Sequence, residues 1–262
     1  MNKNAQYSIG AIIVALILIG GGYYLWNDLN ASYIGKTGTQ NESGATSTIS
    51  NEPGVTFGEL ATPTIPVPKL DRPITFPPSF TPDAQELMRF KIGELTSILQ
   101  NNPSNFSAWL DLGIRRKQIE DFEGARQAWE YASALQPANN ISYLNLGILY
   151  HYFLKDYAKA EKNFRTSIQN SPVYPQTYNE LHDLYRYSYK QNTTAAIDIL
   201  EEGLVATNSN INLLVTLAKY YRDVKQDMTN ARTYFVQARD AAEKAGNTEL
   251  AAALDAEISA LQ

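Results

Sequence analysis

The sequence predicts an all-α protein in which helical hairpins stack into a solenoid behind an apolar N-terminal segment. Two observations lead to this prediction. A pattern of large, small and aromatic residues returns four times from Asn105 onward, at spacings of 34 to 36 (109 to 143, 143 to 178, 178 to 214). A fixed period of this length is typical of repeat proteins, in which each unit buries its apolar face only against its neighbours. The second observation is an almost purely aliphatic run at residues 9–19.

Each copy of the repeat consists of two sets of residues with helical spacing. The copies read Trp109, Leu112, Gly113, Ala125, Trp129, Ala132, Pro137; Tyr143, Leu146, Gly147, Tyr150, Ala160, Phe164, Ser167, Pro172; Tyr178, Leu181, Tyr185, Ala196, Leu200, Gly203, Asn208; and Leu214, Leu217, Ala218, Tyr221, Ala231, Phe235, Ala238. Steps of three or four place each set on one face of a helix. Small residues such as Gly113 and Ala125 allow the two helices of a unit to approach closely, whereas a large side chain there would overpack the unit.

This pattern resembles the tetratricopeptide repeat over about residues 106–241. Three positions depart from the family pattern: Arg116 stands where Tyr is usual, His182 where Gly is usual and Asn208 where Pro is usual. The third copy has two extra residues between its helices, so we expect a bulged turn near residues 190–194. The resemblance implies a right-handed α-solenoid of about four hairpins that binds other proteins and catalyses no reaction.

Helix signals at both ends of the repeats predict capping helices. Thr81-Pro82-Asp83 combines a hydroxyl cap, a first-turn proline and an early carboxylate, and predicts a helix over 81–102. A last helix is expected over 247–262, with an apolar face and a solvated face. The whole solenoid is then expected at 81–262, with repeats at about 106–139, 140–174, 175–210 and 211–245.

Residues 1–27 are predicted to form a transmembrane anchor. No residue between Lys3 and Asp28 carries a formal charge. Residues 9–26 would form about 27 Å of helix, close to the roughly 30 Å of a hydrocarbon core. Aromatic residues occupy the end of this run, where an interfacial belt is expected: Tyr23, Tyr24 and Trp26.

A cleaved signal peptide is the alternative for this segment, although no Ala-x-Ala cleavage pattern is present. Lys3 lies on one side of the apolar run, and Asp28 and Lys36 lie on the other. This distribution favours a cytoplasmic N-terminus and an extracytoplasmic repeat domain.

Residues 28–80 are predicted to form a linker of two parts. The first part is rich in Ser, Thr, Gly and Asn and should be a flexible coil, whereas seven of the twelve prolines fall between residues 63 and 82. Pro63-Thr64-Ile65-Pro66 matches a PxxP ligand pattern, but an extended stalk explains it better. The stalk is unusually apolar, so we expect part of it to lie along the first capping helix; the residues concerned are Ile65, Val67, Leu70, Ile74, Phe76 and Phe80.

Composition argues against several classes of function. The net charge is −5 and no basic cluster exceeds Arg115-Arg116-Lys117, so nucleic-acid binding has little electrostatic basis. The absence of Cys rules out thiolate catalysis and Cys-ligated zinc. His151 and His182 lie in different repeats without a ligand pattern and are expected to be ordinary helix residues. No catalytic residue, metal site or cofactor is therefore expected.

The resemblance also implies a partner-binding surface, the concave groove lined by the first helix of each unit. Positions one and five after the Trp-type residue are Leu110, Ile114, Leu144, Ile148, Asn179, Asp183, Val215 and Lys219. The next exposed positions are Lys117, His151, Tyr152, Arg186, Tyr187 and Arg222. The carboxylate-clamp subfamily has Lys and Asn where this chain has Leu110 and Ile114, so chaperone C-termini are not the expected ligand.

We therefore expect a membrane-anchored scaffold or adaptor that binds a protein or peptide partner. A partner segment with apolar residues toward one end and acidic or polar residues toward the other would fit the predicted groove. The alternative is a self-associating structural component of an envelope, secretion or pilus assembly. An enzyme would need a cluster of titratable groups that the sequence does not show.

Overall fold

A computed structural model of the chain describes residues 65–191 and 193–261, which belong to one compact unit, Gly58–Gln262. The predicted membrane anchor and the first part of the predicted linker lie outside these residues. Within the described ranges the secondary structure is helical and contains no strand, which confirms the all-α prediction. No helix in these ranges combines the length and the apolar character needed to cross a membrane.

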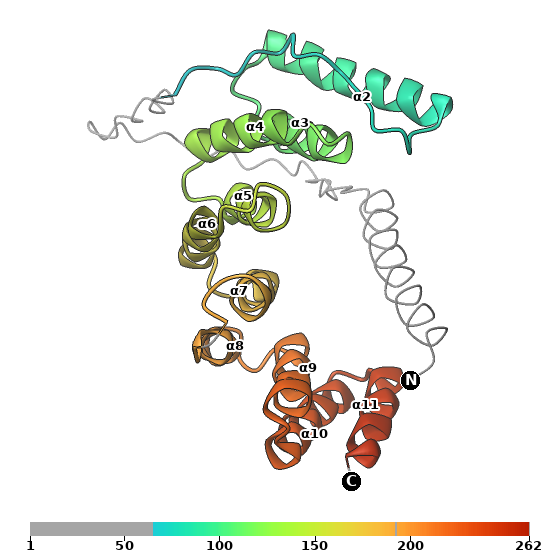
Figure 1. Ribbon diagram of the computed structural model, residues 1–262, viewed down its shortest axis with the longest axis vertical. Coiled ribbons are helices and arrows are strands. Elements are labelled where there is room, and N and C mark those ends of the chain that lie inside the picture. Colours follow the sequence, from blue (N-terminus) through green and yellow to red (C-terminus); the bar gives the residue numbers. More distant parts are fainter. Residues whose placement is uncertain (1–64, 192, 262) are drawn as a thin grey trace, which may run out of the picture. The chain divides into compact units, whose positions relative to one another are not determined.

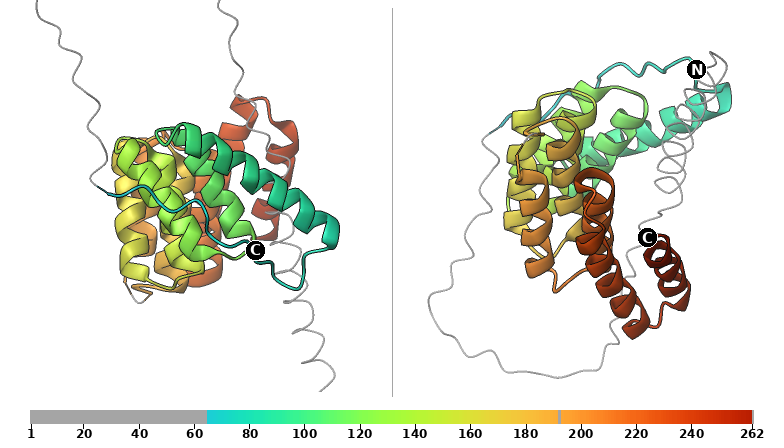
Figure 2. Two further views of the ribbon diagram at one scale, coloured as in Figure 1. Left: turned by 90° about the horizontal axis from the view of Figure 1, so that it is seen from above. Right: turned by 60° about the horizontal axis from the view of Figure 1, so that its bottom comes forward.

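Four helical hairpins follow one another along the chain (Figure 1). They are α3 (Phe106–Gln118) with α4 (Phe122–Leu135), α5 (Asn140–Tyr152) with α6 (Tyr157–Asn170), α7 (Pro175–Tyr187) with α8 (Ala195–Ala206), and α9 (Ile211–Tyr220) with α10 (Met228–Lys244). A π-helical turn, η1 (Tyr221–Lys225), continues α9. Helix α2 (Pro82–Asn101) precedes the first hairpin and α11 (Thr248–Ala260) follows the last. The second helix of each hairpin also packs on the first helix of the next, so the hairpins stack in chain order as in an α-solenoid (Figure 2).

Most helices begin at a residue whose side chain accepts a hydrogen bond from a backbone N–H of the first turn, which satisfies a donor that has no intrahelical partner. These residues are Thr81, Asn105, Asp121, Asn139, Asp156, Asn210, Asp227 and Asn247. The third hairpin differs, because neither α7 nor α8 has a side-chain cap. Its inter-helix loop runs over residues 188–194, and Lys190 has a φ of 59°. This is the turn for which the sequence predicts a bulge.

Close approach of the two helices in a hairpin depends on a missing side chain. A Cβ atom added to Gly113 would lie 2.2 Å from Nε1 of Trp129, and one added to Gly147 would lie 2.5 Å from Cδ1 of Phe164. The third hairpin has His182 at the corresponding position, fully buried, with Nδ1 2.7 Å from the Ala196 carbonyl oxygen. A polar contact to the second helix therefore replaces the glycine–ring contact there.

The Pro-rich segment (residues 65–80) lies in part on α2, as the sequence predicts, and also contacts the first hairpin. Its backbone carbonyls accept hydrogen bonds from α2, at Phe80 from Gln85 Nε2 (3.1 Å) and at Ile74 from Arg89 Nη1 (3.4 Å). Four of its side chains pack against the buried cluster that Met88, Ile92 and Trp109 help to form: Leu70, Ile74, Phe76 and Phe80.

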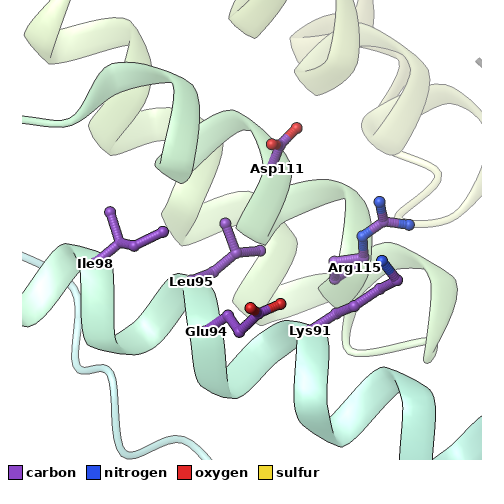
Figure 3. Close-up of a pocket in the computed structure, with 6 residues that line it drawn as sticks. All are labelled: Lys91, Glu94, Leu95, Ile98, Asp111 and Arg115. Atoms are coloured by element: carbon purple, nitrogen blue, oxygen red, sulfur yellow. The ribbon is translucent and has the colours of Figure 1, made fainter. Parts of the chain in front are cut away.

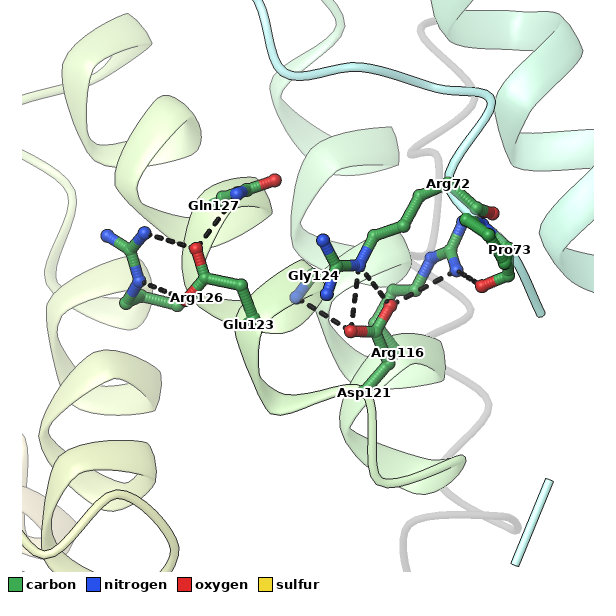
Figure 4. A network of polar contacts seen from close by, with 8 residues as sticks. All are labelled: Arg72, Pro73, Arg116, Asp121, Glu123, Gly124, Arg126 and Gln127. Atoms are coloured by element: carbon green, nitrogen blue, oxygen red, sulfur yellow. Dashed lines mark hydrogen bonds and ion pairs between the residues drawn. The ribbon is translucent and has the colours of Figure 1, made fainter. Parts of the chain in front are cut away.

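Arg116, which departs from the repeat pattern, binds this segment. Its side chain is only 3% exposed. Nη1 donates to the Pro73 carbonyl (2.9 Å) and Nη2 donates to the Arg72 carbonyl (3.0 Å) (Figure 4). Nη1 also contacts Asp121 (3.1 Å), which forms an ion pair with Arg72 (2.7 Å). Burial raises the pKa of Asp121, but hydrogen bonds from Arg72 and from the Gly124 N–H outweigh it and hold that pKa below its ordinary value.

We expect the substitution Gly113→Leu to lower the free energy of unfolding by about 1–3 kcal/mol, because the new side chain must displace the Trp129 ring from a packed core. Gly93→Leu in α2 is the matched control. An added Cβ at Gly93 meets no atom within 4 Å, so the better helix former should leave stability unchanged or raise it. Urea denaturation followed by circular dichroism measures both variants. Equal effects of the two substitutions would show that the helices do not depend on this contact.

Removal of the Pro-rich segment is expected to destabilise the repeats, because Arg116 loses its carbonyl partners and the apolar cluster loses four side chains. Fragments starting at residues 65 and 81 differ only by this segment. We expect the shorter one to melt at least about 5 °C lower, the shift that a loss of about 2 kcal/mol produces in a domain of this size. Identical melting curves would contradict a stabilising role for the segment.

Candidate protein-binding face

The first helices of successive hairpins contact one another directly, α5 with α7 and α7 with α9. Residues from different repeats can therefore form one continuous surface, as the resemblance implies. The structure divides the fourteen predicted surface residues into three groups: those in the core, those used in contacts between helices, and those that remain accessible.

Two of the predicted residues belong to the core. Leu144 is 3% exposed and lies in the large central cluster. His151 is 2% exposed, and its Nε2 lies 2.9 Å from Ser188 Oγ at the end of the third hairpin. The prediction that these two side chains line an open groove is wrong, because the neighbouring hairpins cover them.

Seven more predicted residues are engaged in packing or pairing. The side chains of Leu110, Ile114 and Ile148 are half-buried against the central cluster, and Val215 is half-buried against the C-terminal cluster. These residues therefore do not form an open apolar patch over the first two repeats. The remaining members are polar: Asn179 accepts a hydrogen bond from Thr216 (2.9 Å), Arg222 forms ion pairs with Asp223 and Glu257 (both 2.6 Å), and Lys117 interacts with Glu180.

Four further predicted residues lie at one stretch of α7 together with Lys117, and a residue that the prediction missed lies at its centre. Glu180 and Asp183 are one turn apart on α7, so they lie on the same side of the helix. Hydrogen bonds from Tyr152 on α5 and from Gln176 reach Glu180, and the charge of Lys117 on α3 acts on it as well. We call this surface the α7 face; it consists of Lys117, Tyr152, Glu180, Asp183, Arg186 and Tyr187. Lys219, the remaining predicted residue, is exposed on α9.

The two carboxyl groups of the α7 face are held in a poorly solvated position. Burial raises the pKa of Glu180 to about 7, and the nearby charge of Asp183 raises it as well. Burial also raises the pKa of Asp183 to about 6, although the charge of Arg186 acts in the opposite direction. Oε2 of Glu180 is buried and has no hydrogen-bond partner among the described residues. An unpartnered acceptor of this kind is unfavourable until a donor reaches it.

Aromatic side chains flank these carboxyl groups. Tyr152 is 40% exposed and Tyr187 is 58% exposed. The guanidinium of Arg186 lies over the ring of Tyr187 (4.7 Å to its centroid) and near that of Tyr220 (5.6 Å). Buried carboxylates beside exposed tyrosine rings suit a cationic group, which the carboxylates attract by charge and the rings by cation–π contact.

The charges of this face reverse part of the sequence-based expectation. The sequence led us to expect that the last two repeats bind acidic or polar residues of a partner, because Arg186 and Arg222 belong to the predicted surface there. In the structure Arg222 is paired with Glu257 and Arg186 rests on tyrosine rings. The incompletely paired charge there is negative and lies on the half-buried side chains of Glu180 and Asp183. The repeat pattern alone could have included Glu180 as the i, i−3 neighbour of Asp183, but its burial comes from contacts with α5 that the pattern does not show.

Two further features of this face concern chemistry. Within residues 65–191 and 193–261, no three His, Asp or Glu side chains are grouped so that they could hold a metal ion. Tyr185 lies beside the face but is buried, and its hydroxyl donates to Glu161.

Comparison with known proteins identifies no relative that assigns a function. No protein-family model matches the sequence, and no curated protein matches it. Among solved structures the chain is similar to a crystal structure of MamA, with a TM-score of 0.48 and 19% identity over 64% of this chain and 98% of that one. It is also similar to a MamA RS-1 ArsTM double mutant, with a TM-score of 0.46 and 17% identity over 60% of this chain and 83% of that one. At this level of similarity, the assignment of the fold rests on the chain's own packing.

Proposed function

We propose that this chain is a non-enzymatic scaffold that binds a protein partner along the first helices of its hairpins, and that the α7 face holds a basic segment of that partner. The observation that carries the proposal is the buried, unpartnered Oε2 of Glu180 next to Asp183 and two exposed tyrosines. A lysine or arginine side chain would supply the missing donor. It would also offset the burial that now raises the pKa of both carboxyl groups.

The remaining surface of the first helices would position the partner on either side of this point. Half-buried apolar side chains of α3 and α5 lie on one side, and Lys219 lies exposed on α9 on the other. Tyr and Arg are the residue types that most often carry binding energy at protein interfaces, and both occur in the α7 face. The expected partner segment therefore has a basic residue at the third repeat.

The proposal includes retention at a membrane through residues 1–27, with the N-terminus in the cytoplasm and the repeats outside it. Its support is the sequence: an uncharged run between Lys3 and Asp28, and a linker before the repeats.

Binding of a basic peptide should depend on the α7 carboxylates and on pH. We expect a fluorescein-labelled peptide of alternating Arg and Ala to bind at least tenfold more weakly to the Glu180→Gln, Asp183→Asn variant, which loses two charge-assisted hydrogen bonds. Affinity for the unmodified chain should rise between pH 5.5 and 8, because both carboxyl groups ionise in this range. Lys117, Arg186 and Asp223 are the other charged groups that act on this face.

The matched control is Glu243→Gln, Glu249→Gln, which changes the net charge equally on the exposed surfaces of α10 and α11. It should bind the peptide as the unmodified chain does, and fluorescence polarisation measures all three proteins. Equal weakening in both variants would mean that the peptide responds only to overall charge, and the α7 face would lose its assigned role. Leu110 and Ile148 are unsuitable for this test because their substitution would disturb the core.

Membrane retention is tested on the full chain in isolated membranes. We expect the chain to stay with the membrane pellet after an alkaline carbonate wash and the 65–262 fragment to appear in the supernatant, because only the full chain has the apolar run. Protease should be added to cells whose outer layers have been removed but whose cytoplasmic membrane is intact. It should degrade the repeats and spare the N-terminus. Release of the full chain by carbonate would overturn the anchoring part of the proposal and leave the α7 face untouched.

A further inference from the structure

Helix α2 occupies the place of the second helix of a hairpin, but no described residues form the first helix. It packs on α3 as α4 packs on α5 and α6 on α7. In each complete hairpin, the second helix also packs against its own first helix, and α2 has none among residues 65–81. The Pro-rich segment covers only part of it, through Gln85, Arg89 and the buried cluster around Met88. One side of α2 therefore lacks the helix that a hairpin would place there.

This uncovered side is apolar at both ends and charged in the middle. Leu87 is 52% exposed, Phe90 61% and Ile98 43%. Lys91 and Glu94 lie between them, and positions 87, 91, 94 and 98 recur at the spacing of one helix face. Large apolar side chains exposed together in this way mark interaction surfaces in soluble domains.

A cleft of about 210 Å³ lies between this side of α2 and helix α3 (Figure 3). Leu95 and Ile98 form its apolar part, and the side chains of Asp111 and Arg115 reach it from α3. Its charged lining consists of Lys91, Glu94, Asp111 and Arg115, two of each sign. A strongly acidic or strongly basic partner would place like charges against two of these four residues. A partner surface that also carries both signs of charge would avoid this repulsion.

The order of residues on α2 is complementary to itself when the helix is reversed. If two copies of α2 run antiparallel with their centres between positions 92 and 93, Leu87 of one copy faces Ile98 of the other. In the same register Lys91 faces Glu94. Each pair occurs twice, as a two-fold interface requires. Leu87 of one copy then lies against Ile98, one of the two residues that form the apolar part of the other copy's cleft.

We propose that α2 is a homodimer interface, in which a second copy of the chain covers the exposed side of α2 in this antiparallel register. The second copy supplies a helix that residues 65–81 do not provide at this end of the stack. Leu87 enters the partner's cleft at Ile98, and two Lys91–Glu94 ion pairs fix the register. The residues of this interface and its cleft are not residues of the α7 face.

The chain contains no cysteine, so engineered disulfides test the register without background. We expect the Leu87→Cys, Ile98→Cys variant of the full-length chain to form a covalent dimer on mild oxidation and each single variant to remain monomeric on a non-reducing gel. Eleven positions along a helix span about 16 Å, far beyond the roughly 7 Å limit between Cα atoms in a disulfide. The two cysteines of one chain therefore cannot join, and neither can two copies of the same cysteine across the two-fold axis.

Charge reversal tests the same register without a crosslink. Lys91→Glu alone and Glu94→Lys alone should each raise the dimer dissociation constant about tenfold, because like charges then face each other twice. The Lys91→Glu, Glu94→Lys variant should have the dissociation constant of the unmodified chain, because both ion pairs re-form with their signs exchanged. Val205→Glu, a charge added at an apolar residue of α8 that is 86% exposed, should have no effect. Sedimentation velocity of the full-length chain over a concentration series gives the constants.

Two results would overturn the proposal. A full-length chain that sediments as a monomer at about 100 µM, with no crosslink in the double-cysteine variant, would show that something other than a second copy covers α2. A dimer that forms but gives equal crosslinking in the single-cysteine variants, or that the double charge reversal fails to restore, would place the interface elsewhere or in another register. Neither result would bear on peptide binding by the α7 face.

Discussion

The fold depends on aromatic rings that occupy space left by glycine. Trp129 and Phe164 fill the positions where Gly113 and Gly147 would carry a Cβ atom. This contact brings the two helices of a hairpin so close that the second helix can also reach the next hairpin. The Trp129 ring also holds the backbone, because its Nε1 donates to the Leu110 carbonyl at 3.1 Å. In the first hairpin, packing and hydrogen bonding thus fix the same inter-helix distance.

A second contact fixes how one hairpin follows another. The polar atom of the large residue in the first helix donates to the carbonyl of a proline six positions earlier, in Trp109 to Pro103 (2.8 Å) and in Tyr178 to Pro172 (2.9 Å). Each proline lies in the turn before its hairpin, so the turn is tied to the helix that it precedes. Because the first helices are placed this way, side chains from α3, α5 and α7 meet on one surface.

The sequence predicts the parts of this structure that depend on neighbours within a repeat. Helix spacing, the glycine positions and the caps at Thr81 and Asn247 are local, and each is visible in a short stretch of residues. Burial by other repeats is not local. Residue spacing predicts the side of α5 on which His151 lies. It does not show that Ser188, from the next hairpin, lies against the His151 ring. Arg116 looked like a loss of the repeat pattern because its partners, the carbonyls of Arg72 and Pro73, lie over forty positions earlier.

The same reasoning explains why the centre of the α7 face was missed. In the repeat pattern, Glu180 stands between two residues that pack in the core. The pattern alone therefore predicts an ordinary solvent-exposed carboxylate at this position. Burial raises its pKa and the charge of Asp183, one turn along α7, raises it further, whereas the hydrogen bond from Tyr152 on α5 lowers it. Perturbed ionisable groups of this kind concentrate at functional sites, since a buried carboxylate with an unpartnered oxygen lowers stability without aiding packing. The two surfaces also support each other: a dimer through α2 would carry two α7 faces, so a partner with two basic segments would bind it more tightly than either face alone allows.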